Sequence, residues 1–279
     1  MEQSVLHTPP PPEPPELPEG VGPRWPAWYA GVGFLVALIA TLIAVGVVAV
    51  ATGAGSDDED PVFTIVATLM QSLIFIGTAV LFASFVRTPR PWHFGLRGAP
   101  FWPSVGWAAL GMVSFYLLAA AYSALVSPDA EQTVAQDLGA DEGTFGLIAA
   151  GFMVICVAPF AEEFFFRGFF YRALRSRFSV LVAAAIDGAL FGVIHYDFSG
   201  ADALLILPPL AVLGFMFCLV FEKTGSLWPV VALHAFNNAI AYGVAVEDAT
   251  VPLVLGPVML AACMLLPRLM PPAPAPRHA

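Results

Sequence analysis

Residues 162–167 read Glu162-Glu163-Phe164-Phe165-Phe166-Arg167, and they set two adjacent acids and an arginine inside one of the most apolar stretches of the chain. A charged side chain at the centre of a bilayer costs roughly 2.5–3.5 kcal/mol on insertion scales, so a chain that keeps three of them together is expected to use them. Glu163 and Arg167 are spaced i, i+4, share a helix face and can neutralise each other. Glu162 points about 100° away and has no basic partner nearby in the sequence, which suits a general base.

The surrounding composition is that of a membrane protein. The chain has 279 residues, of which 58% are hydrophobic and 11% charged, against about 25% charged in soluble domains. Apolar stretches long enough to span a bilayer recur, so the sequence predicts an all-α, polytopic transmembrane helical bundle of about eight spans. We expect these spans at residues 27–53, 62–86, 101–126, 145–171, 179–198, 202–221, 226–244 and 250–267. The net charge of −10 argues against a nucleic-acid partner.

Basic residues fall on every second predicted loop, starting before the first span, and the other loops are acidic. The basic positions are Arg24, Arg87, Arg90, Arg97, Arg172, Arg175, Arg177, Lys223 and Arg268. The positive-inside rule then places both termini in the cytosol. Glu162 precedes Arg172 by about ten residues, which puts it roughly 15 Å from the cytosolic edge. We therefore expect a multi-pass protein of the plasma (inner) membrane with a site that opens toward the cytosol.

The two ends of the chain differ from its centre. Residues 1–25 are proline-rich and predicted to be a disordered arm, either a flexible tail or a docking segment, and residues 271–279 are predicted to be a disordered tail. Residues 26–270 form the predicted transmembrane domain, with a motif-bearing core at about 145–244.

Two histidines lie inside predicted spans downstream of the acids. Phe191 and His195 are spaced i, i+4, and so are His234 and Asn238. An imidazole and an amide on one helix face can both donate hydrogen bonds to an oxyanion. A lone histidine in an apolar span is more often a packing residue, but two of them together with the acidic pair favour a hydrolytic site. Asp187 is a further mid-span acid, for which we expect a structural role.

The sequence lacks the motifs of three other classes of membrane protease. The HExxH zinc motif, the GxGD motif of intramembrane aspartyl proteases and a GxSx motif with a later histidine are all absent. The ordered segments that are present read EExxxR (Glu162, Glu163, Arg167), FxxxH (Phe191, His195) and HxxxN (His234, Asn238). In order, spacing and placement in consecutive spans they resemble the CPBP family of intramembrane proteases. This family, also called Abi, groups CAAX prenyl endopeptidases with bacteriocin-processing enzymes.

The resemblance implies roles for the motif residues. Glu162 would activate water together with His195, His234 and Asn238 would form the oxyanion hole, and Glu163 and Arg167 would support the site. It implies an endopeptidase that cuts near the C-terminus or in a membrane-proximal segment of a protein or peptide substrate, lipidated or not. No cofactor is required on this interpretation. The alternative is a metalloprotease with Zn²⁺ held by Glu162, His195 and His234, although an amide such as that of Asn238 is a poor zinc ligand.

Two other functions stay open at this point. The fold could serve as a non-catalytic membrane scaffold or bacteriocin immunity protein that binds a partner through the proline-rich arm. A transporter with mid-membrane acids that relay protons is a further alternative, which the lack of an internal sequence repeat disfavours. On each interpretation the protein contacts membrane lipid and no nucleic acid.

Overall fold

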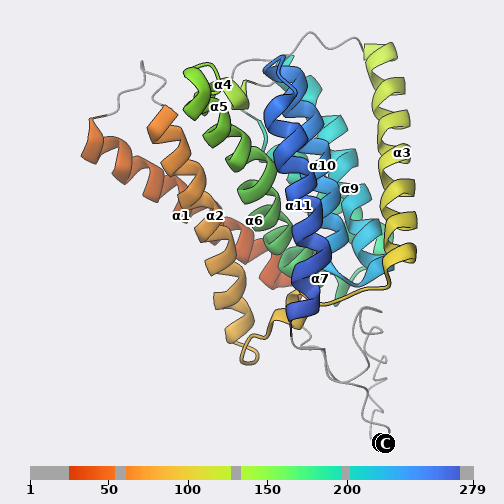
Figure 1. Ribbon diagram of the computed structural model, residues 1–279. Coiled ribbons are helices and arrows are strands. Elements are labelled where there is room, and N and C mark those ends of the chain that lie inside the picture. The colour runs from red at the N-terminus through yellow and green to blue at the C-terminus, as the bar shows by residue number, and fades with distance from the viewer. Residues whose placement is uncertain (1–24, 54–60, 127–132, 197–201, 271–279) are drawn as a thin grey trace, which may run out of the picture.

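The computed structural model describes residues 25–53, 61–126, 133–196 and 202–270. In these ranges all regular secondary structure is helical, which confirms the predicted all-α, polytopic bundle (Figure 1). The predicted tails fall on 1–24 and 271–279, outside the described residues. Trp25, the last residue of the predicted N-terminal arm, is buried. The helices of eight residues or more are α1 (Trp28–Thr52), α2 (Pro61–Ser84), α3 (Phe101–Val126), α5 (Gly143–Phe152), α6 (Ala158–Phe165), α8 (Val180–Val193), α9 (Leu207–Thr224), α10 (Leu227–Ala245) and α11 (Thr250–Leu269).

Six helical stretches among the described residues are long and apolar enough to cross a membrane. They are Trp28–Thr52, Pro61–Ser84, Phe101–Val126, Gly143–Arg175, Leu204–Thr224 and Thr250–Leu269. The other two predicted spans correspond to α8, which has 14 residues, and to α10. The count of eight spans and the cytosolic termini therefore stay predictions. Helix α1 begins and α11 ends at the same end of the bundle, which we call the terminal face (Figure 1).

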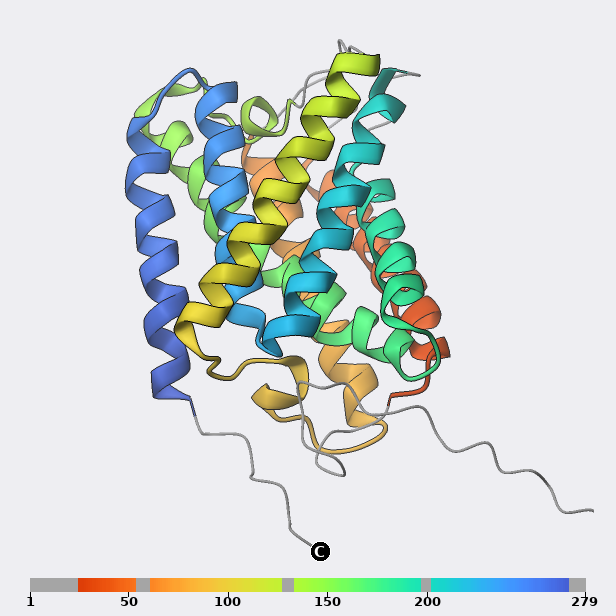
Figure 2. The same ribbon diagram turned by 90° about the vertical axis from the view of Figure 1, so that its right-hand side faces the viewer.

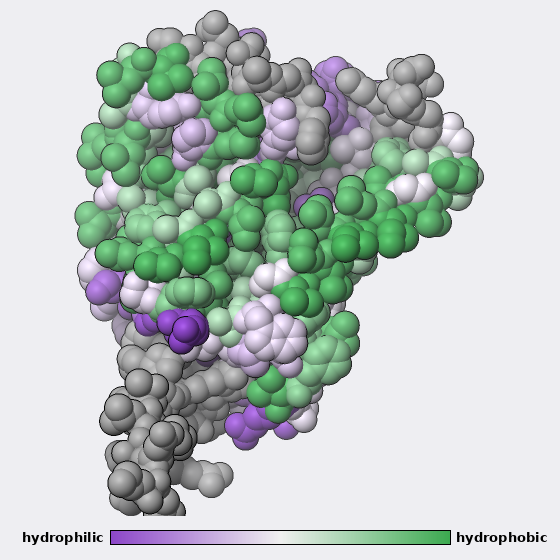
Figure 3. Space-filling model, turned by 180° about the vertical axis from the view of Figure 1, so that it is seen from behind, coloured by the Kyte–Doolittle hydropathy of each residue, from purple (hydrophilic) through white to green (hydrophobic). Residues whose placement is uncertain are grey.

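The outside of the bundle is apolar. Only Tyr29, Ala30, Gly33 and Ala37 of α1 are buried. Phe34 packs against the rings of Phe166 and Phe170, and many of the other apolar side chains of α1 are exposed. Figure 3 shows apolar side chains over most of one face of the molecule. A helix satisfies its own backbone hydrogen bonds, so such a surface is stable in contact with lipid chains.

Helix α6 lies in the interior, between α2 and α10. Figure 2 shows α3 crossing in front of α9 and α10, with α11 beside α10. Helices α8 and α9 approach most closely, because small residues meet at their interface. A Cβ atom added to Gly188 would lie 2.5 Å from the carbonyl oxygen of Ala211, and one added to Gly214 would lie 3.0 Å from the Cα atom of Gly188. Small residues at such contacts are typical of packed membrane helices.

The long stretch that contains α6 is not a uniform α-helix. A π-helical segment, η2 (Met153–Val157), precedes α6, and a second one, η3 (Phe166–Tyr171), follows it. Segments of this kind occur mostly as single turns inside α-helices and often at functional sites. The acidic pair of residues 162 and 163 therefore lies on a short α-helix of eight residues between two π-helical turns.

The connection between α2 and α3 is held against the terminal face by hydrogen bonds to backbone carbonyls. The Leu227 N–H donates to the carbonyl of Gly95 at 2.8 Å, and the Arg97 Nε–H donates to the carbonyl of Gly225 at 2.7 Å. Gly95 has a φ of +81°, and a Cβ atom there would lie 2.6 Å from a ring carbon of Phe221. A side chain at this position would therefore meet both backbone strain and a clash.

Candidate active site

Three fully buried charged side chains form the base of the site. The Arg167 guanidinium donates to Glu163 Oε1 at 2.9 Å and to the carbonyl of Gly214 at 2.8 Å. Its Nη2 atom also lies 3.4 Å from Asp187 Oδ1, across the interface with α8. Glu163, Arg167 and Asp187 are each 0% exposed. The i, i+4 pair predicted from the sequence is confirmed, and Asp187 joins it from a second helix, in keeping with its predicted structural role.

His234 connects this buried cluster to Glu162. Its Nδ1 atom lies 2.8 Å from Glu163 Oε1, and its Nε2 atom lies 3.9 Å from Glu162 Oε2. Because Arg167 also donates to Glu163 Oε1, this oxygen acts as an acceptor, and the Nδ1 atom of His234 carries a proton. Nε2 is then directed at Glu162. The side chain of Glu162 is 15% exposed, and its Oε2 atom has no hydrogen-bond partner among the described residues.

Aromatic rings surround the charged groups. The Arg167 guanidinium carbon lies 4.6 Å from the centre of the Phe191 ring and 5.1 Å from that of Phe217. The same two rings lie 5.7 Å and 5.0 Å from the imidazole of His234. Cation–π contacts of this kind are strongest where water is excluded. Phe191, the first residue of the FxxxH motif, thus forms part of the wall of the site.

His195 lies at the edge of this aromatic wall, two residues beyond the end of α8. Its Nδ1–H donates to the carbonyl of Phe191 at 2.7 Å, because a carbonyl oxygen can only accept. That bond fixes the tautomer and leaves Nε2 as an acceptor. The rings of His195 and Phe191 are 4.8 Å apart. In the described ranges His195 makes no hydrogen bond or ion pair with Glu162 or His234, so it is linked to them through Phe191.

Asn238 lies one turn after His234 on α10. Its Nδ2 atom donates to the carbonyl of Val154 at 2.9 Å, and its Oδ1 atom accepts a weak bond from Asn237 at 3.4 Å. Val154 belongs to the π-helical segment η2, where the wider turn changes the backbone hydrogen-bond pattern and leaves a carbonyl available to a side chain. The bond to Val154 orients the amide and leaves its second Nδ2 hydrogen for another acceptor.

Some contributions to the site were not predicted. The carbonyl of Gly214 accepts from Arg167, and a backbone acceptor has no signature in the sequence. The close approach of α8 and α9 that brings it there could have been inferred from Gly188 and Gly192, which are small residues at i, i+4. Cys218 is fully buried on α9, next to Arg167 and Asp187.

A second polar cluster lies nearer the terminal face. The Arg175 side chain donates to both carboxylate oxygens of Glu222, at 3.1 and 3.0 Å, and the Tyr171 hydroxyl donates to the same carboxylate at 2.8 Å. Close by, Arg172 donates to the carbonyl of His93. Burial, and secondarily the positive charge of Arg172, lowers the pKa of His93 from 6.5 to about 4. These groups join η3, α9 and the connection before α3.

The ligands proposed for Zn²⁺ do not converge as the metalloprotease alternative requires. Among the described residues no group of three His, Cys, Asp or Glu side chains is close enough to hold a metal ion. The Nδ1 atom of His234 is bonded to Glu163, so Nε2 is the nitrogen left available to a ligand.

Comparison with known proteins identifies the segment that carries these residues. The family profile described as "Type II CAAX prenyl endopeptidase Rce1-like" matches residues 144–240. The uncharacterized protein YyaK of Bacillus subtilis (strain 168) is a curated relative with 29% identity over 136 residues. That alignment covers 47% of this chain and 44% of the relative. No solved structure matches the chain.

All three motifs, from residue 162 to residue 238, fall inside the matched segment and in the predicted order. The Rce1-like match over residues 144–240 thus agrees with the family predicted from these motifs.

Proposed function

We propose that the protein is an intramembrane endopeptidase of the CAAX-protease type, with Glu162 as its general base. The observation that carries this proposal is the placement of Glu162, whose Oε2 atom lies 3.9 Å from His234 Nε2 inside the segment that matches the family. Two polar atoms at this separation are too far apart for a direct hydrogen bond, but both can bond one water molecule. That water is the proposed nucleophile.

The proposed reaction is a direct hydrolysis. The water oxygen attacks the carbonyl carbon of the scissile peptide bond while Glu162 takes the proton that the water releases. The developing oxyanion accepts hydrogen bonds from Asn238 and from His234, which donates at Nε2 when its ring carries both protons. The carbon–nitrogen bond then breaks, and Glu162 returns the proton to the leaving amine. His195, with its acceptor at Nε2, is proposed to orient the water together with Glu162.

Glu163 and Arg167 are proposed to hold this arrangement rather than to touch the substrate. Glu163 binds His234 Nδ1 and Arg167 through the same oxygen, and both residues are fully buried. A carboxylate behind an imidazole fixes its orientation and tautomer, as in other hydrolytic sites. Removing either partner would therefore misplace the His234 ring.

The proposed substrate is a protein or peptide that is cut near its C-terminus or in a membrane-proximal segment, lipidated or not. An apolar cavity of about 410 Å³ supports this choice, because it lies between α2, α5–α6 and α11 and is lined by Ala161, the residue before Glu162. Its walls can receive an apolar part of the substrate beside the general base. We place the protein in the plasma membrane, with the site open to the cytosol, on the strength of the basic loops at that end.

The test is hydrolysis of a fluorogenic peptide panel, which includes a farnesylated CAAX peptide, by protein purified in detergent. Glu162→Gln should lower kcat by at least about 10²–10⁴, the usual contribution of a general base. The matched control is Glu142→Gln, an exposed acid on the first turn before α5, which should cleave like the wild type. Each protein is also assayed with a chelator.

The outcomes separate the candidate functions. Cleavage that is lost in Glu162→Gln and unaffected by the chelator supports the proposal. Loss with the chelator and recovery with Zn²⁺ would replace it with a metalloprotease that uses Glu162, His195 and His234. An active Glu162→Gln variant would overturn the assignment of the base, and no cleavage of any peptide would favour a non-catalytic scaffold.

A further inference from the structure

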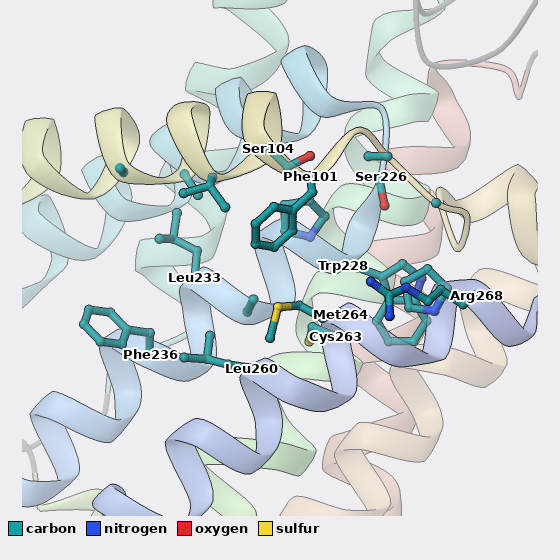
Figure 4. A pocket seen from close by; sticks show the side chains of 18 residues that line it. Phe101, Ser104, Ser226, Trp228, Leu233, Phe236, Leu260, Cys263, Met264 and Arg268 are labelled. Atoms are coloured by element: carbon teal, nitrogen blue, oxygen red, sulfur yellow. The ribbon is translucent and has the colours of Figure 1, made fainter.

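A second apolar cavity, of about 480 Å³, lies between α3, α10 and α11 (Figure 4). Its volume is within the range of about 300–1,000 Å³ that is typical of small-molecule sites. Its lining contains none of the motif residues, although it shares Trp228 and Cys263 with the cavity that Ala161 lines. Figure 4 shows Leu233, Phe236 and Leu260 toward one end of it, and Trp228 and Arg268 toward the other.

The hydroxyl groups that line this cavity are already engaged. Ser104 donates to the carbonyl of Pro100 at 2.7 Å, and Ser226 donates to the carbonyl of Arg97 at 2.6 Å. These two side chains therefore offer no free donor to a ligand in the cavity.

Two other donors remain without partners. Trp228 is 5% exposed, and its Nε1 atom is buried with no hydrogen-bond partner among the described residues. Because the Nε1 atom itself has almost no accessible surface, it is not presented to a ligand in the cavity. Arg268, in the last turn of α11, makes no hydrogen bond or ion pair within the described part of the chain. Arg268 is exposed and is the charged residue of the lining, so this end of the cavity suits an anionic group.

The apolar end calls for a hydrocarbon chain. Leu260 and Arg268 are about eight residues apart on α11, so the apolar and cationic ends are separated by roughly 12 Å along the helix. Arg268 lies where α11 ends at the terminal face, which is the level of the lipid headgroups if the helix spans the bilayer. Tryptophan and arginine are enriched at that level, and basic pockets between membrane helices bind anionic headgroups.

We propose that this cavity binds one acyl chain of an anionic membrane phospholipid, with the phosphate held by Arg268. The lipid is a resident ligand and not the substrate, so the inference goes beyond the proposed function and does not depend on it. The Trp228 ring lies 6.1 Å from that of Phe160, which is on the same helix as Glu162. An occupant of the cavity therefore contacts a residue that packs directly against α6.

The experiment uses the full chain in nanodiscs that contain a photo-crosslinking phosphatidylglycerol or a phosphatidylcholine with the same acyl chains. Crosslinked peptides are mapped by mass spectrometry. We expect labelling of α3, α10 and α11 around the cavity, several-fold stronger with phosphatidylglycerol. Arg268→Gln should remove that preference, whereas Arg177→Gln, an exposed arginine outside the cavity, should keep it.

A second variant tests the cavity itself. Ala232→Phe should fill it and abolish labelling with either lipid, and a thermal unfolding curve like that of the wild type shows that the variant is folded. Labelling that is equal for both lipids, that is spread over all outward helix faces, or that persists in a folded Ala232→Phe variant would overturn the proposal. None of these outcomes bears on peptide cleavage.

Discussion

Replacing Arg167 with methionine is expected to destabilise the fold strongly, because it leaves buried acids without their counter-charge. Arg167 donates to Glu163 and to the carbonyl of Gly214, and it lies 3.4 Å from Asp187. Neither acid is exposed to solvent. Breaking a buried ion pair by removing one partner typically costs about 3–5 kcal/mol, and methionine keeps much of the side-chain volume, so the loss reports charge rather than a cavity. We expect the free energy of unfolding to fall by that amount.

The assay is equilibrium unfolding by denaturant in detergent micelles, followed by tryptophan fluorescence. The matched control is Arg177→Met, at an exposed arginine, which should change the free energy of unfolding by no more than about 0.5 kcal/mol. Adding Glu163→Gln to Arg167→Met should recover part of the loss, because one of the two orphaned charges is removed. A loss no larger than that of the control, or a double variant less stable than the sum of the single changes, would refute this reasoning.

The tight approach of α8 and α9 predicts that Gly214→Ala lowers the free energy of unfolding by about 1–3 kcal/mol. The new Cβ atom would lie 2.9 Å from the Cβ atom of Phe191. The control is Gly77→Ala, at a helix position where a new Cβ atom meets open space. It should raise the free energy of unfolding by about 0.5–1 kcal/mol in the same assay. For His93, a folded-state pKa of about 4 against 6.5 in the unfolded chain means that the unfolded state takes up the proton first. The contribution of neutral His93 to the free energy of unfolding is therefore fully present above pH 6.5 and is lost as the pH falls toward 4. His93→Gln, which cannot titrate, should lose less stability than the wild type between about pH 7 and about pH 4.5 in denaturant midpoints; equal losses would contradict the assignment.

The parts of the site that could be predicted from the sequence are those set by local helix geometry. Glu163 and Arg167 pair as their i, i+4 spacing predicts, because that contact depends only on the helix that carries both. The bond between His234 and Glu163 joins residues 71 apart in the chain, and no local pattern indicates which of the two adjacent acids the imidazole contacts.

The limits of the prediction are clearest in α8. An apolar run extends over residues 179–198, but the helix ends at Val193, since hydropathy alone does not mark where a helix stops. His195 consequently lies in the turn beyond α8 and not on its face. The bond from Asn238 to Val154 could not be predicted, because it depends on a π-helical turn that hydropathy cannot reveal. The role at an oxyanion that the motif predicts for Asn238 stays a prediction.

The direction in which Glu162 points depends on the number of residues in the π-helical segment η2 that precedes α6. A π-turn holds one residue more than the α-turn it replaces, so every residue after it is rotated by about 100° relative to an uninterrupted α-helix. Deleting a single residue within Met153–Val157 would convert η2 into ordinary α-helix and turn the whole acidic face away from α10. A substitution within that segment leaves this register unchanged, whereas a change of length by one residue there shifts it. Alignments of related proteins should therefore place gaps outside this segment.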